Sequence, residues 1–342
     1  MRLTFLGTSA GAPTRTRNVT SHALTLDDGA IWLLDCAEAT QHRFLLAGLR
    51  PKSVERILIT HLHGDHCYGL PGMLACLGIH QRREPIQISG PRGLREMVLT
   101  TLRLSDMHPP FRIDWAECET GRASELPLLA SENAAQDERR RGRWTVSAHP
   151  LVHRVPCFGY CLAEAPRQGR FKPETARALG IPEGPLWGRL QRGEFVHVAG
   201  TEFRPEQVSE PPRRGRKLLL LGDTCDADAM LEAGQGADLV VREATYDDSR
   251  LEKARKWQHS TARMSGEFAH ALHARELILT HLSARFTGET SNADPAEDGE
   301  GGRVIDLDQL KIEAESACPG TRVLLADDLW THEIPASDEP AG

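Results

Sequence analysis

The 342-residue sequence lacks the features of membrane, disulfide-linked and zinc-finger proteins. No stretch approaches the roughly 20 consecutive apolar residues that a membrane helix needs, and the N-terminus shows no secretory signal pattern. The eight cysteines are scattered without a Cys-x-x-Cys pair, which favours reduced thiols over disulfides or a thiolate zinc site. We therefore expect a cytoplasmic protein that does not contact a membrane.

An excess of positive charge is also missing, because the formal net charge is -7. This balance argues weakly against a nucleic-acid partner, although the charge is patchy and several basic runs occur. The composition is 40% hydrophobic and 26% charged, which is typical of globular proteins. The length is sufficient for a substantial buried core.

The order of patterns along the chain predicts an α/β fold with two mixed β-sheets flanked by helices. Short strands joined by hairpins fill residues 1–36, and strands alternate with helices afterwards. The segments ERILITHLHGDH and ELILTHLS echo each other in the two halves. We interpret residues 1–336 as one domain, with a disordered acidic loop at 287–302 and a flexible tail at 337–342.

Three histidines and an aspartate follow the apolar run ILIT within six positions. A lone histidine at a strand end is usually a hydrogen-bonded surface residue, but this density favours a metal site. In a turn after a strand, His61 and His63 can face one metal while Asp65 and His66 face a second. Imidazole and carboxylate ligands without thiolates suit zinc in an open, catalytic geometry.

Further candidate ligands occur downstream at the ends of predicted strands. Asp223 follows the buried run LLLLG, where a carboxylate needs a cation or donors to offset its desolvation. His281 has the same placement after LILT. His153 precedes the strand CFGYCL, although His149 competes with it for this role.

These motifs resemble the ribonuclease Z family of the metallo-β-lactamase superfamily, endonucleases that remove 3′ trailers from precursor tRNA. The resemblance runs from Leu3 to about Pro335 and rests on motifs that occur in the family's order. They are FLGTSAGAPTRTRNVTS, THLHGDHCYGLPG, HRVPCFGYCL, LGDT, REAT, HST and THLSARF. It implies a metallo-β-lactamase-like αββα sandwich, and a zinc-dependent endoribonuclease that leaves a 3′-hydroxyl on the tRNA.

The resemblance also implies roles for individual residues. It assigns two Zn²⁺ per subunit, with Mn²⁺ also acceptable to such ligands. One zinc would be held by His61, His63 and His153, the other by Asp65, His66 and His281, with Asp223 as the bridge. Asp65 would also orient the attacking hydroxide.

The resemblance also implies which residue donates a proton to the leaving oxygen. His259 of HST takes this role, and Glu243 of REAT orients it. Without the resemblance, His259 reads as a solvated histidine in a basic loop and Glu243 as a surface carboxylate. The family usually has a histidine where this chain has Arg242, which makes the hydrogen bonding around Glu243 the point in question.

Binding of RNA is expected at two further places. Arg15 and Arg17 match a family loop near the active site, although a basic run is commonly only a solvated surface. Residues 171–193 resemble the arm that grips tRNA, within a protruding segment at about 166–200 that contains Gly184 and Pro185. Such an arm usually acts across a homodimer, although this stretch also reads as an ordinary packed excursion.

Two rival functions share some of these features. A small-molecule phosphodiesterase or another hydrolase of the superfamily would have the same metal ligands without a tRNA arm. A zinc-binding RNA-binding or scaffold protein would lack catalysis, which the complete set of expected ligands disfavours.

Overall fold

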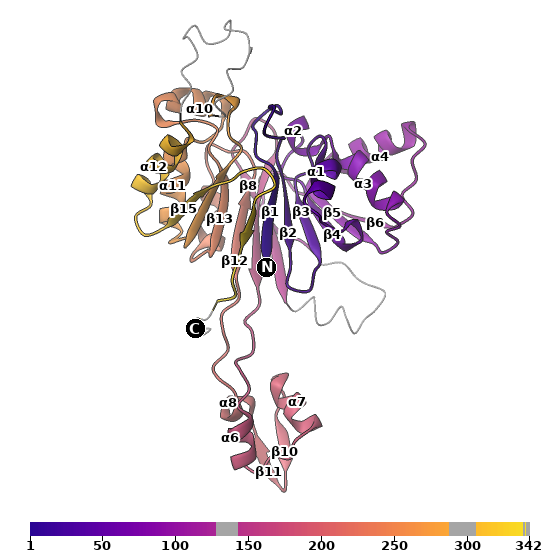
Figure 1. The fold of residues 1–342 in the computed structure, drawn as a ribbon, viewed down its shortest axis with the longest axis vertical. Helices are drawn as coiled ribbons and strands as arrows, with labels where there is room; N and C mark the ends of the chain where they lie inside the picture. The colour runs from indigo at the N-terminus through magenta and orange to yellow at the C-terminus, as the bar shows by residue number, and fades with distance from the viewer. Residues whose placement is uncertain (128–142, 287–305, 338, 340–342) are drawn as a thin grey trace, which may run out of the picture.

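Two seven-stranded β-sheets face each other in the computed structural model, which describes residues 1–127, 143–286, 306–337 and 339. Helices cover the outer face of each sheet, so that the layers run helix, sheet, sheet, helix (Figure 1). The predicted α/β sandwich is therefore confirmed. The predicted disordered loop at 287–302 and most of the predicted tail lie outside the described residues.

The first sheet is built from the N-terminal part of the chain and one C-terminal strand. Its strands, in spatial order, are β16 (Thr331–Glu333), β1 (Arg2–Gly7), β2 (Ser21–Thr25), β3 (Ile31–Leu34), β4 (Val54–Leu58), β5 (Ile86–Pro91) and β6 (Ile113–Cys118). The pairs from β3 to β6 are parallel, and those from β16 to β3 are antiparallel. Its outer helices are α1 (Thr40–Leu46), α3 (Leu70–Ile79) and α4 (Leu94–Leu104).

The second sheet has the same mixed design. Its strands are β15 (Arg322–Leu325), β14 (Glu276–Thr280), β13 (Leu239–Glu243), β12 (Lys217–Leu221), β9 (Cys157–Glu164), β8 (Trp144–Leu151) and β7 (Ser124–Glu125). The pairs from β12 to β15 are parallel. Its outer helices include α9 (Leu231–Gly234), α11 (Ala262–Ala271) and α12 (Leu307–Ala317).

Strand β12 illustrates why these apolar runs become central strands. Leu218 and Leu220 point into the core between the two sheets, whereas Leu219 points into the core under the helices. All three are at most 2% exposed. A strand that is buried on both faces needs a continuous apolar run rather than an alternating one.

A small unit projects from the sandwich between β9 and β12. It contains α6 (Pro173–Ala178), α7 (Pro185–Gln191), the hairpin of β10 (Val196–Val198) and β11 (Thr201–Phe203), and α8 (Pro205–Val208). A separate apolar cluster that includes Ala176, Leu190 and Val208 forms its core. The unit hangs from the end of the sandwich opposite α2 (Gly64–Cys67) and α10 (Leu251–Trp257) (Figure 1).

Buried charges join the foot of this unit to the sandwich. The Glu164 side chain is fully buried and accepts from Arg216 Nε at 2.8 Å, Arg167 Nη2 at 2.7 Å and Arg143 Nε at 3.1 Å. The same three arginines also contact Asp27, in the turn between β2 and β3. Burial alone would raise the pKa of Glu164, but Arg216 and Arg167 hold it below its ordinary value.

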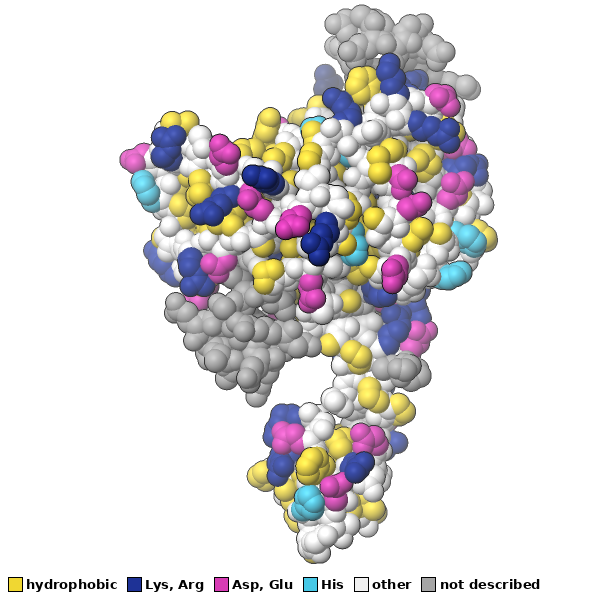
Figure 2. All heavy atoms as spheres, turned by 180° about the vertical axis from the view of Figure 1, so that it is seen from behind, with side chains coloured by type: hydrophobic (Ala, Val, Ile, Leu, Met, Phe, Trp, Pro, Cys, Tyr) yellow, Lys and Arg dark blue, Asp and Glu magenta, His cyan; other side chains and the backbone are white. Residues whose placement is uncertain are grey.

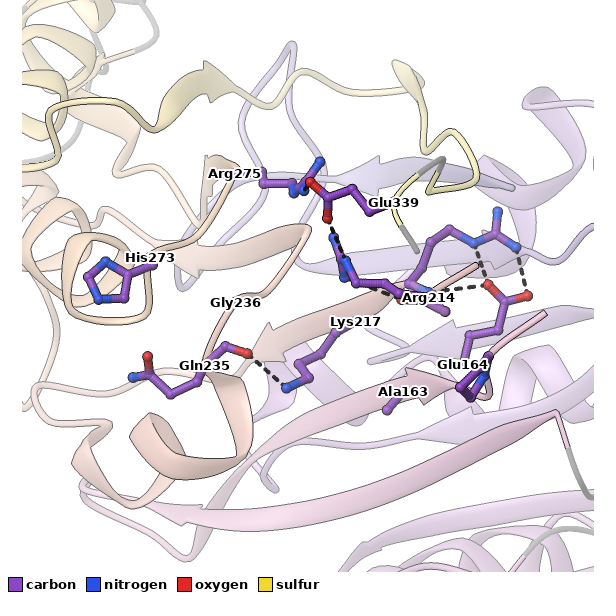
Figure 3. A pocket seen from close by; sticks show the side chains of 12 residues that line it. Ala163, Glu164, Arg214, Lys217, Gln235, Gly236, His273, Arg275 and Glu339 are labelled. Carbon is purple, nitrogen blue, oxygen red and sulfur yellow. Dashed lines mark hydrogen bonds and ion pairs between the residues drawn. The ribbon is translucent and has the colours of Figure 1, made fainter. Parts of the chain in front are cut away.

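A pocket of about 500 Å³ lies beside these charges (Figure 3). The arginine and lysine side chains that line it are already hydrogen-bonded or ion-paired with carboxylates and carbonyls around the pocket. Arg214 and Arg275 both turn to Glu339, and Lys217 donates to the Gln235 carbonyl at 2.8 Å. Figure 2 shows basic and acidic side chains interspersed over the face that it presents.

Several residues of the basic runs are buried and have structural partners. Arg216 is 2% exposed and serves Glu164, and Arg82 is 3% exposed and donates to the Lys52 and Pro85 carbonyls. Sequence patterns do not separate such arginines from solvated ones, because their partners come from distant segments. Among the described residues, no helix has the length and apolar character that a membrane crossing requires.

The Glu164 cluster predicts a specific effect on stability. Removing the charge in Glu164→Gln leaves Arg216 buried without its main partner, which costs about 3 kcal/mol of unfolding free energy. Denaturant titration at pH 7 measures this loss. Glu174→Gln is the matched control, since Glu174 pairs with Arg177 on the surface and the change there stays within about 0.5 kcal/mol.

The difference in unfolding free energy between wild type and Glu164→Gln should depend on pH, because the pKa of Glu164 is lowered in the folded state. Because the pKa of Glu164 is lower in the folded state, its ionised carboxylate stabilises the fold. This stabilisation is fully present above the unfolded-state pKa of about 4.5, and it is lost as the pH falls through the folded-state pKa. The difference between wild type and Glu164→Gln therefore shrinks in acid. A difference that is absent at pH 7 would contradict this role.

Candidate active site

The candidate site lies at the carboxyl ends of the parallel strands of both sheets. The cluster from His61 to His66 follows β4, Asp223 follows β12, and His281 follows β14. Glu243 is the last residue of β13, and His153 lies in the loop between β8 and β9. Because parallel strands end at the same edge, segments far apart in sequence meet here.

One group of possible ligands contains three histidines. The Nε2 atom of His61 lies 3.0 Å from Nδ1 of His63, which is 3.3 Å from Nε2 of His153. The carboxylate of Asp223 completes the group, with Oδ2 3.7 Å from Nε2 of His61. The structure thus brings His153 to the site, as predicted.

The second group shares Asp223 with the first. Nε2 of His66 and Nε2 of His281 are 3.3 Å apart, and they lie 3.4 Å and 3.3 Å from Asp223 Oδ2. Asp65 Oδ2 is 3.6 Å from His66 and 3.4 Å from His281. A single aspartate oxygen therefore faces histidines of both groups, as a bridging carboxylate would.

The spacing and chemistry of these atoms fit metal ligands. Zinc binds imidazole nitrogen at 2.0–2.1 Å, so two nitrogens on one tetrahedral ion are about 3.3 Å apart. Several of the nitrogen pairs above have this separation. Histidine and carboxylate donors without a thiolate are typical of catalytic sites that keep a position open.

Hydrogen bonds orient the imidazoles so that the inward nitrogens stay available. His66 Nδ1 is 2.8 Å from Asp35 Oδ2, His153 Nδ1 is 2.9 Å from the Gln258 carbonyl, and His281 Nδ1 is 2.9 Å from Thr245 Oγ1. Asp35 is itself fixed by the amide and hydroxyl of Thr60. Such supporting partners raise the affinity of a metal site.

The backbone is unusual at three of these positions. Asp35, Gln258 and His281 have φ of 56°, 57° and 55°, in the left-handed region that non-glycine residues rarely adopt. Gly222 has a different constraint, because a Cβ at this position would lie 2.6 Å from the Thr60 side chain. Local strain and close approach of this kind collect at functional sites.

Burial and neighbouring charges favour a neutral His61 and an anionic Asp223, the forms in which these groups bind a metal, whereas they favour a charged His66. Burial, reinforced by His66, lowers the pKa of His61 well below its usual value. Burial opposes ionisation of Asp223, yet His281 and His66 outweigh it and lower its pKa. Burial also opposes charge on His66, but Asp223 and Asp35 raise its pKa well above normal.

His259 and Glu243 form an adjacent pair. His259 Nδ1 lies 3.0 Å and 3.1 Å from the two Glu243 oxygens, while the ring lies 5.1 Å from that of His153 between centroids. Burial lowers the pKa of His259, but Glu243 raises it to about 9. His259 therefore lies beside the metal-ligand groups, with Glu243 favouring its charged form.

Arg242 does not disturb the pairing of Glu243. Its guanidinium is buried, donates to Ser260 Oγ at 2.9 Å and lies 4.6 Å from the Phe268 ring centroid. Ser260 Oγ donates to the Thr224 carbonyl, and the Thr224 amide donates to Glu243 at 2.7 Å. The arginine therefore braces the loop that carries His259 instead of contacting the site.

Other predicted site residues lie elsewhere. His149 is bound to Ser147 Oγ at 2.8 Å and belongs to neither ligand group, which decides its competition with His153. Arg15 is exposed. Arg17 is 8% exposed and donates to Thr8 Oγ1 and the Ala326 carbonyl, so its guanidinium supports the loop.

The predicted arm residues lie in the projecting unit, at the end of the sandwich opposite α2 (Figure 1). Gly184 is the N-cap and Pro185 the first residue of α7. Sequence reasoning missed Asp35, Thr60, Thr245 and Gln258, which orient the ligands. Only Asp35 had a usable signal, because it ends the apolar run IWLL as Asp223 follows LLLLG.

Comparison with known proteins adds independent information. The ribonuclease Z of Thermosynechococcus vestitus is 38% identical over 100% of this chain and 79% of its own length. That of Cyanothece sp. is 39% identical over 99% and 98%. Human tRNase Z, short form, superposes with a TM-score of 0.65 at 27% identity, covering 98% of this chain and 100% of that one.

A family model described as Anti-Pycsar protein Apyc1 matches residues 1–104, which include the cluster from His61 to His66. The sandwich and its histidine–aspartate cluster define a hydrolase with the metallo-β-lactamase fold, and the cluster suggests a bound metal. Within this class, the chain belongs to the ribonuclease Z family. It is a metal-dependent endoribonuclease, as predicted.

The support of His66 by Asp35 can be tested through metal binding. Asp35→Asn keeps the size of the side chain but removes the charge behind His66, so metal affinity should fall about 10- to 100-fold. Titration of the metal-free protein with Zn²⁺ in a competing chelator measures this change. Asp228→Asn, an exposed change at the start of the short 3₁₀ helix that follows Asp223, is the control and should leave affinity unaltered. Equal affinities for both variants would contradict the role of Asp35.

Proposed function

We propose that the protein removes 3′ trailers from precursor tRNA by phosphodiester hydrolysis, with two Zn²⁺ per subunit. The observation that carries the proposal is the position of Asp223, whose Oδ2 faces both ligand groups. Full-length similarity to proteins named ribonuclease Z supports the RNA substrate.

The ligand groups suit this chemistry. His61, His63 and His153 would hold one ion, Asp65, His66 and His281 the other, and Asp223 would bridge them. Paired divalent cations lower the pKa of water and neutralise a phosphodiester during in-line attack. Mn²⁺ is compatible with the same nitrogen and oxygen donors.

The protein's own groups handle the protons. Glu243 keeps His259 protonated, so that Nε2 can donate to the ribose 3′-oxygen as it leaves the phosphorus. Asp65 is oriented by the Gly11 amide at 2.8 Å and would position the attacking water. The products are a 3′-hydroxyl on the tRNA and a 5′-phosphate on the trailer.

The projecting unit is proposed as the tRNA arm, with Gly184 and Pro185 at its second helix. It lies at the opposite end of the sandwich from α2, the helix of its own chain that contains Asp65 and His66 (Figure 1). This placement favours a homodimer in which each arm serves the partner's site. Eight unpaired cysteines agree with a reducing compartment, and we propose that the enzyme acts in the cytoplasm.

Cleavage of an in vitro transcribed precursor tRNA with a 3′ trailer tests this function. Wild type should cut near the end of the acceptor stem, and His259→Ala should slow cleavage about 10²- to 10⁴-fold, since a general acid contributes that much. Asp65→Ala should abolish cleavage. Mapping of both cut ends shows the 3′-hydroxyl and the 5′-phosphate. An intact precursor with wild-type enzyme refutes the proposal.

Replacement of residues 171–208 by a short Gly-Ser linker separates the tRNA enzyme from a small-molecule phosphodiesterase. The ends of this segment are close, because Phe171 and Ser209 form a β-bridge. The variant should hydrolyse bis(p-nitrophenyl) phosphate like wild type and lose precursor cleavage. If the variant retains phosphodiester hydrolysis and precursor cleavage equally, the proposed role of the arm in binding tRNA is wrong.

A further inference from the structure

An exposed tryptophan lies at the rim of the active site. Trp257 is the last residue of α10 and stands two positions before His259. It is 38% exposed, whereas Trp32 and Trp144 in the core are both 5% exposed. An indole left in solvent, two residues before the proposed catalytic His259, is an available stacking surface.

Two cations flank this indole. Arg154 Cζ lies 5.0 Å and Lys256 Nζ 5.6 Å from the ring centroid, within the range of cation–π contact. Both side chains are exposed, and neither is ion-paired with any residue that the structure describes. Their charges are therefore available to a phosphate, in contrast to those of Arg214 and Arg216.

The tryptophan is tied to the catalytic groups on both sides. The next residue, Gln258, turns the chain with φ of 57° and accepts a hydrogen bond from His153 Nδ1 at 2.9 Å. Arg154 directly follows His153 in the sequence. The indole and its cations therefore hold a fixed position relative to His153 and His259.

We propose that Trp257, Arg154 and Lys256 form a stacking site for one nucleobase of the RNA, that of the nucleotide immediately 5′ of the cut. The inference rests on the proposed function, in which His259 donates a proton to the leaving 3′-oxygen. That oxygen belongs to the nucleotide 5′ of the cut, so its base lies nearest to the segment that carries His259. Stacking on an indole accepts any base, and the two cations offset the charge of the adjacent phosphates.

The test combines protein variants with a modified substrate. Trp257→Ala and Trp257→Phe are assayed on a precursor tRNA and on the same precursor with an abasic site immediately 5′ of the cut. With the intact precursor, Trp257→Ala should lower kcat/KM about tenfold, within the usual range for loss of one stacked base. Trp257→Phe should retain most of the activity, because phenylalanine also offers a ring.

The abasic substrate supplies the decisive comparison. Wild type should lose about tenfold on it, and Trp257→Ala should lose nothing more, since the stacking partner is already gone. Ile79→Ala, a truncation of an exposed apolar side chain on α3, is the control and should match wild type on both substrates. Metal content and melting temperature of each variant report on folding.

Three results would overturn the inference. If Trp257→Ala lowers kcat/KM by the same factor on the abasic substrate as on the intact precursor, Trp257 does not contact that base. If the effect of Trp257→Ala disappears only on a substrate whose abasic site lies 3′ of the cut, the stacked base belongs to the trailer. A reduced metal content in Trp257→Ala would make its role structural. If wild type does not cut the intact precursor, the proposed function itself is refuted. This outcome differs from the three above, in which wild type still cuts.

Discussion

The buried carboxylate of Asp223 is the constraint around which the site is organised. Only 3% of this residue is exposed, and its Oδ2 lies within 3.7 Å of nitrogens from His61, His66 and His281. An anion at such depth is unfavourable unless cations or donors surround it. The fold therefore brings histidines from both sheets to one point, where Asp223 is proposed to bridge two metal ions.

The two sheets and their supporting residues make this convergence possible. Parallel strands β4, β12, β13 and β14 deliver their carboxyl ends to one edge, and the left-handed residues behind them turn the imidazoles inward. The opposite end of the sandwich carries the projecting unit, fixed by the Glu164 cluster. Chemistry and the proposed tRNA grip are thus separated within one chain, which is the physical reason for proposing that two subunits cooperate.

The sequence allowed prediction of features that depend on local pattern, but not of those that depend on distant partners. The apolar run before Asp223 and the density of histidines after β4 indicated the two ligand groups, and the similarity of motifs supplied His259 and Glu243. Strand β6 has no clear sequence signal, because most of its residues are half-buried and do not alternate between buried and exposed. The partners of Arg17 and Arg216 could not be read from the sequence, because Ala326 and Glu164, which engage them, are remote along the chain.

Anomalous diffraction from crystals of the zinc-loaded enzyme tests the central claim most directly, because it locates each ion without reference to activity. If Asp223 bridges two ions, the map should contain two peaks per chain, one on each side of its carboxylate. The first should lie among His61, His63 and His153, and the second among Asp65, His66 and His281. A single peak, or peaks that do not contact Asp223, would contradict a shared carboxylate as the organising element of the site.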